Sequence, residues 1–181
     1  CAIVTGVQTC ALPISYLLCV GRLEEYKGVQ HVIRALPKLS EYDLVIAGNG
    51  PYRGELERIA GEEDVANRVK FLGYVEDERL PALYAGAEVY VTMSEFEAYG
   101  MTVAESLAAG TPCVVRDIAG LSDWADRHNC INIERTKPNK IAAAVRRADR
   151  LTGSSEVVPD WKAVIRDLEI IYSNVSSTKH I

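Results

Sequence analysis

The sequence predicts an α/β fold in which helices cover both faces of a doubly wound, mostly parallel sheet. Short β-branched and aliphatic runs recur along the chain, and stretches with apolar residues three or four positions apart separate them. The chain has 181 residues, of which 48% are hydrophobic and 25% are charged. This composition is typical of a soluble globular protein and provides enough apolar material for one sizeable core.

The first half of the chain alternates strand and helix patterns three times. Short apolar runs predict strands at Tyr16–Val20, Asp43–Ala47 and Val69–Leu72. Apolar residues that recur every three or four positions predict the helices after them, at Val29–Leu39, Tyr52–Ala60 and Glu78–Ala85.

The second half repeats this alternation. Strands are predicted at Glu88–Val91, Pro112–Val115 and Cys130–Ile133. Helices are predicted at Met101–Ala109, Ser122–Arg127 and Lys137–Leu151, and at Trp161–Tyr172 after a polar break. Strands separated by helices are joined by right-handed crossovers and lie parallel. Because ligands of such sheets bind at the carboxyl ends of the strands, we expect the functional site in the loops that follow them.

The segment Val4–Ile14 ("VTGVQTCALPI") does not fit this alternation. No Lys or Arg precedes Arg22, so it lacks the basic region of a signal peptide, and polar residues interrupt it too often for a transmembrane helix. One reverse translation resembles a short-read sequencing adapter read in frame. We therefore expect residues 1–15 to be an artefactual leader, 16–173 to form the domain and 174–181 to be a tail. An ordinary non-polar N-terminal arm is the alternative.

Charge and cysteine content argue against several classes of partner. Lys and Arg total 20 against 25 Asp and Glu, a net charge of −5 without a basic block, so nucleic acid or an anionic membrane is not an expected partner. Cys19 and Cys113 lie in apolar runs, and no CxxC pair or even spacing indicates a zinc site or a disulfide framework. We expect a cytoplasmic protein that binds no metal.

The loop after the first predicted strand, "GRLEEYKG", suits a diphosphate. Gly21 lets the chain turn close to a ligand, Arg22 offers a planar fork of donors, and Lys27 adds a point charge. A diphosphate accepts such paired hydrogen bonds and needs its charge neutralised. A surface Arg and Lys that flank a helix start are the alternative interpretation.

The loop after the second predicted strand, "AGNGPYRG", is close to a dinucleotide fingerprint. Arg53 occupies the third glycine position of that fingerprint, and the motif does not follow the first strand of its unit. We interpret it as a tight strand-to-helix turn.

The loop after the fourth predicted strand leads into "SEFEAYGMTVAESLAAGTP". Gly100 indicates that a helix begins near Met101, which leaves Glu97 in the loop and Glu105 inside the helix. The free N–H groups of the first helical residues, Met101, Thr102 and Val103, would point at an anion or a sugar oxygen. The two carboxylates could accept hydrogen bonds from hydroxyl groups beside it.

Five motifs in order resemble one family. "VGRLEEYKGV", "LVIAGNGP", "VKFLGYV", "LYAGAEVYV" and "SEFEAYGMTVAESLAAGTPCVV" are together similar to the C-terminal nucleotide-sugar domain of retaining GT-B glycosyltransferases of family four, from about Tyr16 to Tyr172. The resemblance implies a Rossmann-like domain of a hexosyltransferase that uses a UDP-, GDP- or ADP-sugar without a metal or other cofactor. It also implies a missing N-terminal acceptor domain, and a cytoplasmic protein that could be peripheral to the membrane at full length.

The resemblance also implies roles for individual residues. Arg22 and Lys27 would hold the donor diphosphate and stabilise the charge on the departing phosphate, and Glu97 would contact the donor sugar. Glu105 would accept hydrogen bonds from the ribose. Further donor contacts would come from the backbone of Gly21, Tyr74, Val75, Gly100, Met101 and Thr102, with Tyr74 and Val75 near the base.

Three positions depart from the family pattern. Ala98 stands where Pro is usual, Tyr99 where Phe is usual, and Ala119 where a second Gly is frequent. The last departure weakens any role for the "DIAGLSD" turn. We expect Arg22, Lys27, Glu97 and Glu105 to line one crevice at the carboxyl edge of the sheet.

Two other functions are open. A glycoside hydrolase could use Glu97 and Glu105 as acid and base, although hydrolysis needs no phosphate site and would leave Arg22 and Lys27 without a role. A nucleotide-binding module without chemistry of its own is the other alternative. Because the family builds its active site between two domains, we expect this chain alone to bind nucleotide without catalysing transfer.

Overall fold

The computed structural model describes residues 12–125 and 129–151. Most of the proposed leader, the end of the proposed domain with its helix at 161–172, and the proposed tail at 174–181 lie outside the described residues. Ile14 is fully exposed, and the backbone contacts of the sheet begin at Ser15, whose carbonyl accepts the N–H of Asp43 at 3.1 Å. The interpretation of the leader stays a prediction.

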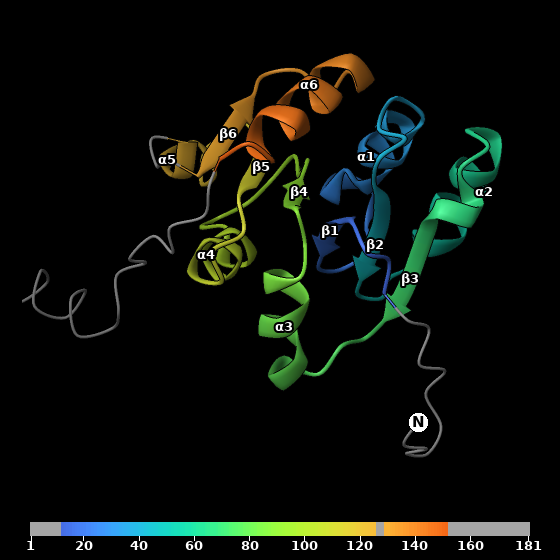
Figure 1. Ribbon diagram of the computed structural model, residues 1–181, viewed down its shortest axis with the longest axis horizontal. Coiled ribbons are helices and arrows are strands. Elements are labelled where there is room, and N and C mark those ends of the chain that lie inside the picture. The colour runs from blue at the N-terminus through green and yellow to red at the C-terminus, as the bar shows by residue number, and fades with distance from the viewer. Residues whose placement is uncertain (1–11, 126–128, 152–181) are drawn as a thin grey trace, which may run out of the picture.

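The described residues form a parallel sheet of six strands, which confirms the predicted fold class (Figure 1). The strands are β1 (Tyr16–Val20), β2 (Asp43–Ala47), β3 (Val69–Gly73), β4 (Val89–Thr92), β5 (Cys113–Arg116) and β6 (Cys130–Ile133). Their order is β3-β2-β1-β4-β5-β6. In this order the chain reverses direction across the sheet between β1 and β4, which is the switch point where doubly wound sheets bind their ligands.

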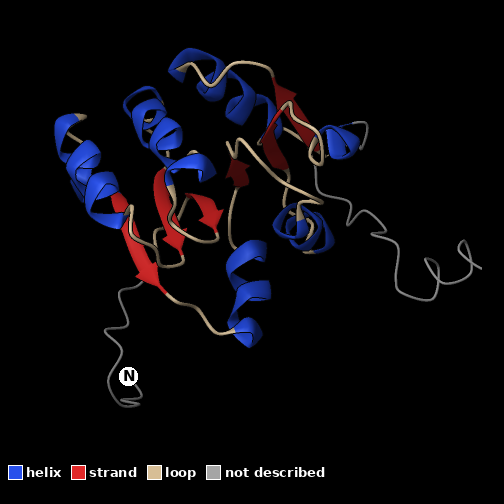
Figure 2. Ribbon diagram, turned by 180° about the vertical axis from the view of Figure 1, so that it is seen from behind, coloured by secondary structure: helices blue, strands red, loops and turns tan. Residues whose placement is uncertain are grey.

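Among the described residues, six α-helices cover the two faces of the sheet (Figures 1 and 2). They are α1 (Val29–Ala35), α2 (Arg53–Glu62), α3 (Leu80–Ala85), α4 (Met101–Ala108), α5 (Ser122–Ala125) and α6 (Pro138–Ala148). One apolar cluster joins α1, α2 and α6 to strand residues such as Leu17 and Cys19. The other joins α3, α4 and α5 to Tyr16 and Leu18. Successive β1 side chains thus enter opposite layers, as the period of a strand requires.

Two helices are shorter than predicted because of proline. The α-helix at Val29 ends at Ala35 and continues only as a short 3-10 turn (Leu36–Lys38), since Pro37 has no N–H to donate to the preceding turn. The segment Asp77–Arg79 likewise forms a 3-10 turn before α3, whose second residue is Pro81. Within the described ranges, no helix is long and apolar enough to span a bilayer.

Candidate functional site

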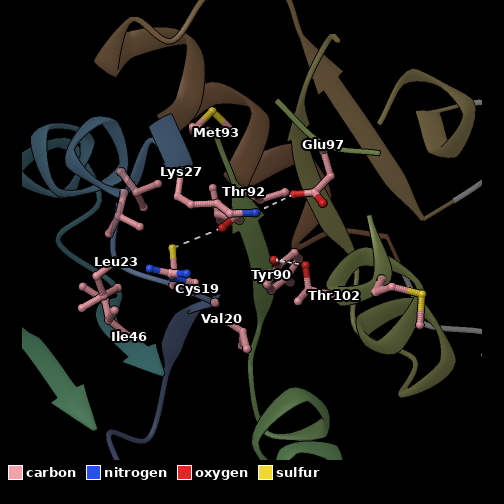
Figure 3. A pocket seen from close by; sticks show the side chains of 16 residues that line it. Cys19, Val20, Leu23, Lys27, Ile46, Tyr90, Thr92, Met93, Glu97 and Thr102 are labelled. Carbon is pink, nitrogen blue, oxygen red and sulfur yellow. Dashed lines mark hydrogen bonds and ion pairs between the residues drawn. The ribbon is translucent and has the colours of Figure 1, made fainter. Parts of the chain in front are cut away.

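A crevice opens where β1 and β4 separate (Figure 3). The two strands pair at Leu17–Val89 and Leu18–Tyr90, and no pairing follows toward their carboxyl ends. A cavity of about 90 Å³ lies beyond this point. Its floor is mostly apolar, and its polar lining includes Arg22, Lys27, Glu97, Thr92 and Thr102. The splayed strand ends therefore bring together three of the four charged residues that the sequence singled out.

Cys19 lines the floor of this cavity without being reactive. Its thiol donates a hydrogen bond to the carbonyl of Val91 at 3.1 Å across the gap between the strands. Burial raises the pKa of this thiol to about 12, so it stays protonated near neutral pH. Cys19 is thus a small apolar residue here, as the sequence predicted.

Lys27 and Glu97 form an ion pair at the mouth of the cavity. The Nζ of Lys27 lies 2.8 Å from Oε2 of Glu97, and about a quarter of each side chain is exposed. Figure 3 shows the two side chains pointing toward each other from separate segments. Lys27 ends the 3-10 turn Glu25–Lys27, and Glu97 lies in the non-helical loop after β4, as predicted.

Gly28 allows these two segments to meet. It has a φ of +73°, and a β-carbon built on it would lie 2.2 Å from the carbonyl oxygen of Met93. Two residues further on, the N–H of Glu95 donates to the carbonyl of Tyr26 at 2.7 Å. The backbone around Lys27 is therefore packed directly against the start of the loop that carries Glu97.

The "DIAGLSD" turn packs against the same loop, and the expectation that Ala119 weakens a role of this turn in the site stays a prediction. A β-carbon on Gly120 would lie 2.1 Å from the carbonyl oxygen of Glu97. The indole Nε1 of Trp124 donates to the carbonyl of Tyr99 at 2.6 Å. Gly120, one residue after Ala119, provides the close approach.

Helix α4 begins at Met101, as predicted, with Gly100 at φ +80° before it. The prediction of three free N–H groups was wrong by one, because the N–H of Val103 donates to the carbonyl of Gly100 at 2.9 Å. Among the described residues, no backbone carbonyl accepts from the N–H of Met101 or Thr102. Both residues line the crevice, so two backbone donors remain at the helix start.

Glu105 is helical, as predicted, but it is not among the residues that line the crevice. Its Oε2 accepts a hydrogen bond from the hydroxyl of Tyr84 at 2.8 Å. The hydroxyl of Tyr90 donates to Oγ1 of Thr102 at 2.7 Å, and the two tyrosine rings meet edge to face at 5.7 Å. Burial raises the pKa of both tyrosines, so their hydroxyls keep their protons. Tyr84 and Tyr90 thus hold α4 in place through hydrogen bonds to Glu105 and Thr102, and the sequence analysis did not identify them.

A second cavity adjoins the crevice. It has a volume of about 290 Å³ and is lined by Tyr74 and Val75, the two residues expected near a base. Gly21 and Arg22 line both cavities. The Arg22 side chain is 75% exposed and its Nη2 lies 2.8 Å from Oε1 of Glu24, so the guanidinium is held only at the surface.

The "AGNGPYRG" segment forms a tight turn against the first loop, which agrees with its interpretation as a strand-to-helix turn. A β-carbon on Gly48 would lie 1.9 Å from the carbonyl oxygen of Gly21, and one on Gly50 would lie 2.2 Å from that of Leu23.

Within the part of the chain that the structure describes, no group of three or more His, Cys, Asp or Glu side chains could hold a metal ion.

The strand order and the polar crevice at its switch point define a doubly wound α/β domain with a candidate ligand site at the carboxyl edge of its sheet. The family described as "Glycosyl transferases group 1" matches residues 14–160. The chain belongs to this family.

Individual relatives agree with the family assignment. An uncharacterized glycosyltransferase of Methanocaldococcus jannaschii is 38% identical over 149 residues, which cover 80% of this chain and 36% of that protein. A glycogen synthase of Mycobacterium tuberculosis is 39% identical over 111 residues, which cover 59% of this chain and 27% of that protein. The chain thus spans about a third of the length of the curated relatives it matches.

Solved structures share the fold. A sucrose-phosphate synthase from Thermosynechococcus elongatus superposes with a TM-score of 0.75 and 24% identity, over 93% of this chain and 47% of its own. HepE of Anabaena, solved in complex with UDP and glucose, gives a TM-score of 0.69 and 22% identity over 76% of this chain and 39% of its own. These likenesses extend the match to the GT-B glycosyltransferases at the level of fold.

Proposed function

We propose that this chain is the donor-binding half of a glycosyltransferase that moves a hexose from a nucleoside-diphosphate sugar to an acceptor hydroxyl with retention. The observation that carries the proposal is the crevice at the switch point, where Arg22, Lys27 and the first N–H groups of α4 converge with Glu97. A nucleotide sugar joins a diphosphate, which needs these donors, to a sugar and a nucleoside. HepE, solved with UDP and glucose, supports this ligand class.

The donor fits the site if it spans both cavities. The crevice of about 90 Å³ is too small for a nucleotide sugar, since ligand pockets usually measure about 300–1,000 Å³. The adjoining cavity of about 290 Å³ would take the nucleoside, with the base near Tyr74 and Val75. The diphosphate would then lie at the shared boundary, beside Gly21 and Arg22.

The charges at the mouth suit departure of a phosphate. As the bond between the anomeric carbon and the phosphate oxygen breaks, negative charge grows on that oxygen. Lys27, Arg22 and the N–H groups of Met101 and Thr102 would stabilise it, which is where fixed donors lower a barrier most. The acceptor oxygen forms the new bond to the anomeric carbon, and its proton passes to the departing phosphate. We propose that these groups supply the charge stabilisation without a metal.

The arrangement favours this function over glycoside hydrolysis. A hydrolase needs two carboxylates that flank one bond, whereas Glu105 does not line the cavity that Glu97 lines. Glu97 is also paired with Lys27, a residue that hydrolysis leaves without a role. A nucleotide-binding module without chemistry stays the alternative for the chain alone, and a cytoplasmic location stays a prediction.

Replacing Arg22 with alanine tests the diphosphate site. Loss of one charge-assisted hydrogen bond should weaken UDP binding by about ten- to a hundredfold and leave uridine binding nearly unchanged. Calorimetric titration of both ligands into wild type and Arg22→Ala measures the difference. Arg58→Ala is the matched control, because Arg58 is an exposed, ion-paired arginine on α2 that lines none of these cavities. Equal losses for UDP and uridine would contradict the assignment.

Glu105 lines neither cavity, so its proposed contact with the ribose requires a ligand that extends beyond them. Replacing Tyr84 with phenylalanine tests this contact. Without the hydroxyl that holds its carboxylate at 2.8 Å, Glu105 should bind uridine about two- to tenfold more weakly. Binding of 2′,3′-dideoxyuridine should not change, because it lacks the hydroxyls that Glu105 would accept from. Glu105→Ala should lower the affinity for uridine and UDP alike. A loss in Tyr84→Phe that is equal for uridine and its dideoxy analogue would indicate a purely structural role for Tyr84.

A further inference from the structure

The "DIAGLSD" turn and Trp124, which follows it in α5, contact three successive residues of the loop that leads into α4. A β-carbon built on Gly120 would lie 2.1 Å from the carbonyl oxygen of Glu97 and 2.9 Å from that of Ala98. The indole Nε1 of Trp124 donates to the next carbonyl, that of Tyr99, at 2.6 Å. The carbonyl groups of these loop residues therefore face the turn, and the proposed donor site leaves the turn without a role.

We propose that Trp124 is a positioning residue for the donor diphosphate. Its hydrogen bond to the Tyr99 carbonyl fixes the peptide between Tyr99 and Gly100, so that the N–H of Gly100 faces the diphosphate. The inference rests on the proposed function and adds to it a residue that acts only through the backbone. Trp124 is 3% exposed and lines neither the crevice nor the adjoining cavity, so it cannot touch the ligand itself.

The geometry of a trans peptide carries this step. Its atoms lie in one plane, and its C=O and N–H groups point in opposite directions. Because the Tyr99 carbonyl points at the indole of Trp124, the N–H of Gly100 points away from it. Glu97 and Met101, which flank this peptide in the chain, both line the crevice. No backbone carbonyl of the described residues accepts from the N–H of Gly100, so this donor is available to a ligand.

The glycine makes this peptide easy to reverse. Reversing a peptide plane changes only the soft dihedral angles on its two sides. Gly100 has a φ of +80°, and glycine adopts positive and negative φ about equally readily, so its backbone alone does not select one orientation. The reversed peptide would turn the Tyr99 carbonyl away from Trp124, and its partial negative charge would repel a phosphate. The reversed state also loses the hydrogen bond from Trp124, which therefore selects the orientation that suits the diphosphate.

Trp124 is itself held in place by the core. It packs in the apolar cluster that also contains Leu121. Its backbone N–H donates to the carbonyl of Leu121 at 3.1 Å, and the N–H of Leu121 donates to the carbonyl of Ile118 at 3.0 Å. The Tyr99 ring meets the indole edge to face, with ring centres 5.3 Å apart. A peptide that is fixed in this way before a ligand binds avoids the cost of ordering it on binding.

Amide NMR on the full 181-residue chain observes this peptide directly. Tyr99–Gly100 is the only Tyr-Gly pair in the sequence, so ¹³C-carbonyl tyrosine combined with ¹⁵N glycine selects a single amide signal. Saturating UDP should move the Gly100 amide proton of wild type downfield, because the N–H donates to phosphate. Saturating uridine should not move it. In Trp124→Phe, which keeps an aromatic ring but has no N–H, the shift caused by UDP should be largely lost.

Calorimetric titration gives the matched measurement of affinity. Trp124→Phe should weaken UDP binding by about two- to tenfold, as expected for loss of one hydrogen bond, and leave uridine binding nearly unchanged. Tyr16→Phe is the control. It removes a buried hydrogen bond to the carbonyl of Leu83 at 2.8 Å, in the same apolar cluster but at the amino end of β1. The two variants should lower the urea midpoint of unfolding by similar amounts, and Tyr16→Phe should keep the affinity for UDP.

The outcomes separate a positioning role from a merely structural one. A Gly100 amide that stays unmoved in wild type saturated with UDP would overturn the inference, and this arm needs no variant to fold. Equal UDP affinities of wild type and Trp124→Phe, or equal losses of UDP affinity in Trp124→Phe and Tyr16→Phe, would overturn it as well. Failure of wild type to bind UDP would contradict the proposed function instead, so the two failures are distinguishable.

Discussion

Replacing Gly28 with alanine is expected to lower the free energy of unfolding by about 2–5 kcal/mol. The residue has a φ of +73°, where an L side chain is strained by about 1–2 kcal/mol. The new methyl group would also lie 2.2 Å from the oxygen and 2.6 Å from the carbon of the Met93 carbonyl. Overpacking of this kind adds about 1–3 kcal/mol. Because the obstacle is backbone, no rotamer change can relieve it.

Urea denaturation followed by circular dichroism measures this loss. Gly54→Ala is the control, since Gly54 lies in α2 with nothing within 4 Å of a built β-carbon. Gly54 is the second residue of α2, and glycine loses more backbone freedom on folding than alanine does, so the control should keep or slightly gain stability. A loss below about 1 kcal/mol in Gly28→Ala would show that the Lys27 segment and the loop after β4 do not pack as described.

The sheet could be predicted from the sequence because each strand is a short apolar run, and the segments between the strands have apolar residues at helical spacing. The order of the strands was not predicted, because right-handed crossovers fix the face on which each helix packs but not which strands are neighbours. The switch point between β1 and β4 is therefore a finding of the structure. Helix ends were less predictable where proline interrupts a periodic pattern. Pro37 ends an α-helix whose apolar residues continue to Leu39.

The candidate site was predictable where one loop carries several functional groups, as in "GRLEEYKG". The hydrogen bonds from Tyr84 and Tyr90 to α4 were not predictable. Both tyrosines lie in apolar sequence patterns that indicate only a place in the core. The support that Gly120 gives to Glu97 was also missed, since it depends on a contact between two segments far apart in the chain. The glycine that follows Lys27 in the sequence indicated a tight turn at Gly28. That this turn packs against the backbone of Met93 could be learned only from the structure.

Replacing Lys27 with alanine is expected to weaken UDP binding by about a hundredfold or more, a larger loss than for Arg22→Ala. If Lys27 binds the donor phosphate as proposed, the variant loses a charge-assisted hydrogen bond to it. It also leaves Glu97 without its partner at 2.8 Å. The unpaired carboxylate would then repel the diphosphate. Uridine carries no phosphate, so its affinity should stay nearly the same, and titration with both ligands separates the two effects.

The double variant Lys27→Ala/Glu97→Gln decides between these contributions. If repulsion by Glu97 matters, removing its charge should recover about tenfold of the lost UDP affinity, while Glu97→Gln alone should leave UDP binding unchanged or tighter. The three variants with wild type form a cycle whose non-additive part measures the coupling of the pair through the ligand. Equal affinities for Lys27→Ala and the double variant would place Glu97 away from the phosphate. Full additivity would mean that the ion pair at the mouth of the crevice does not persist once UDP is bound.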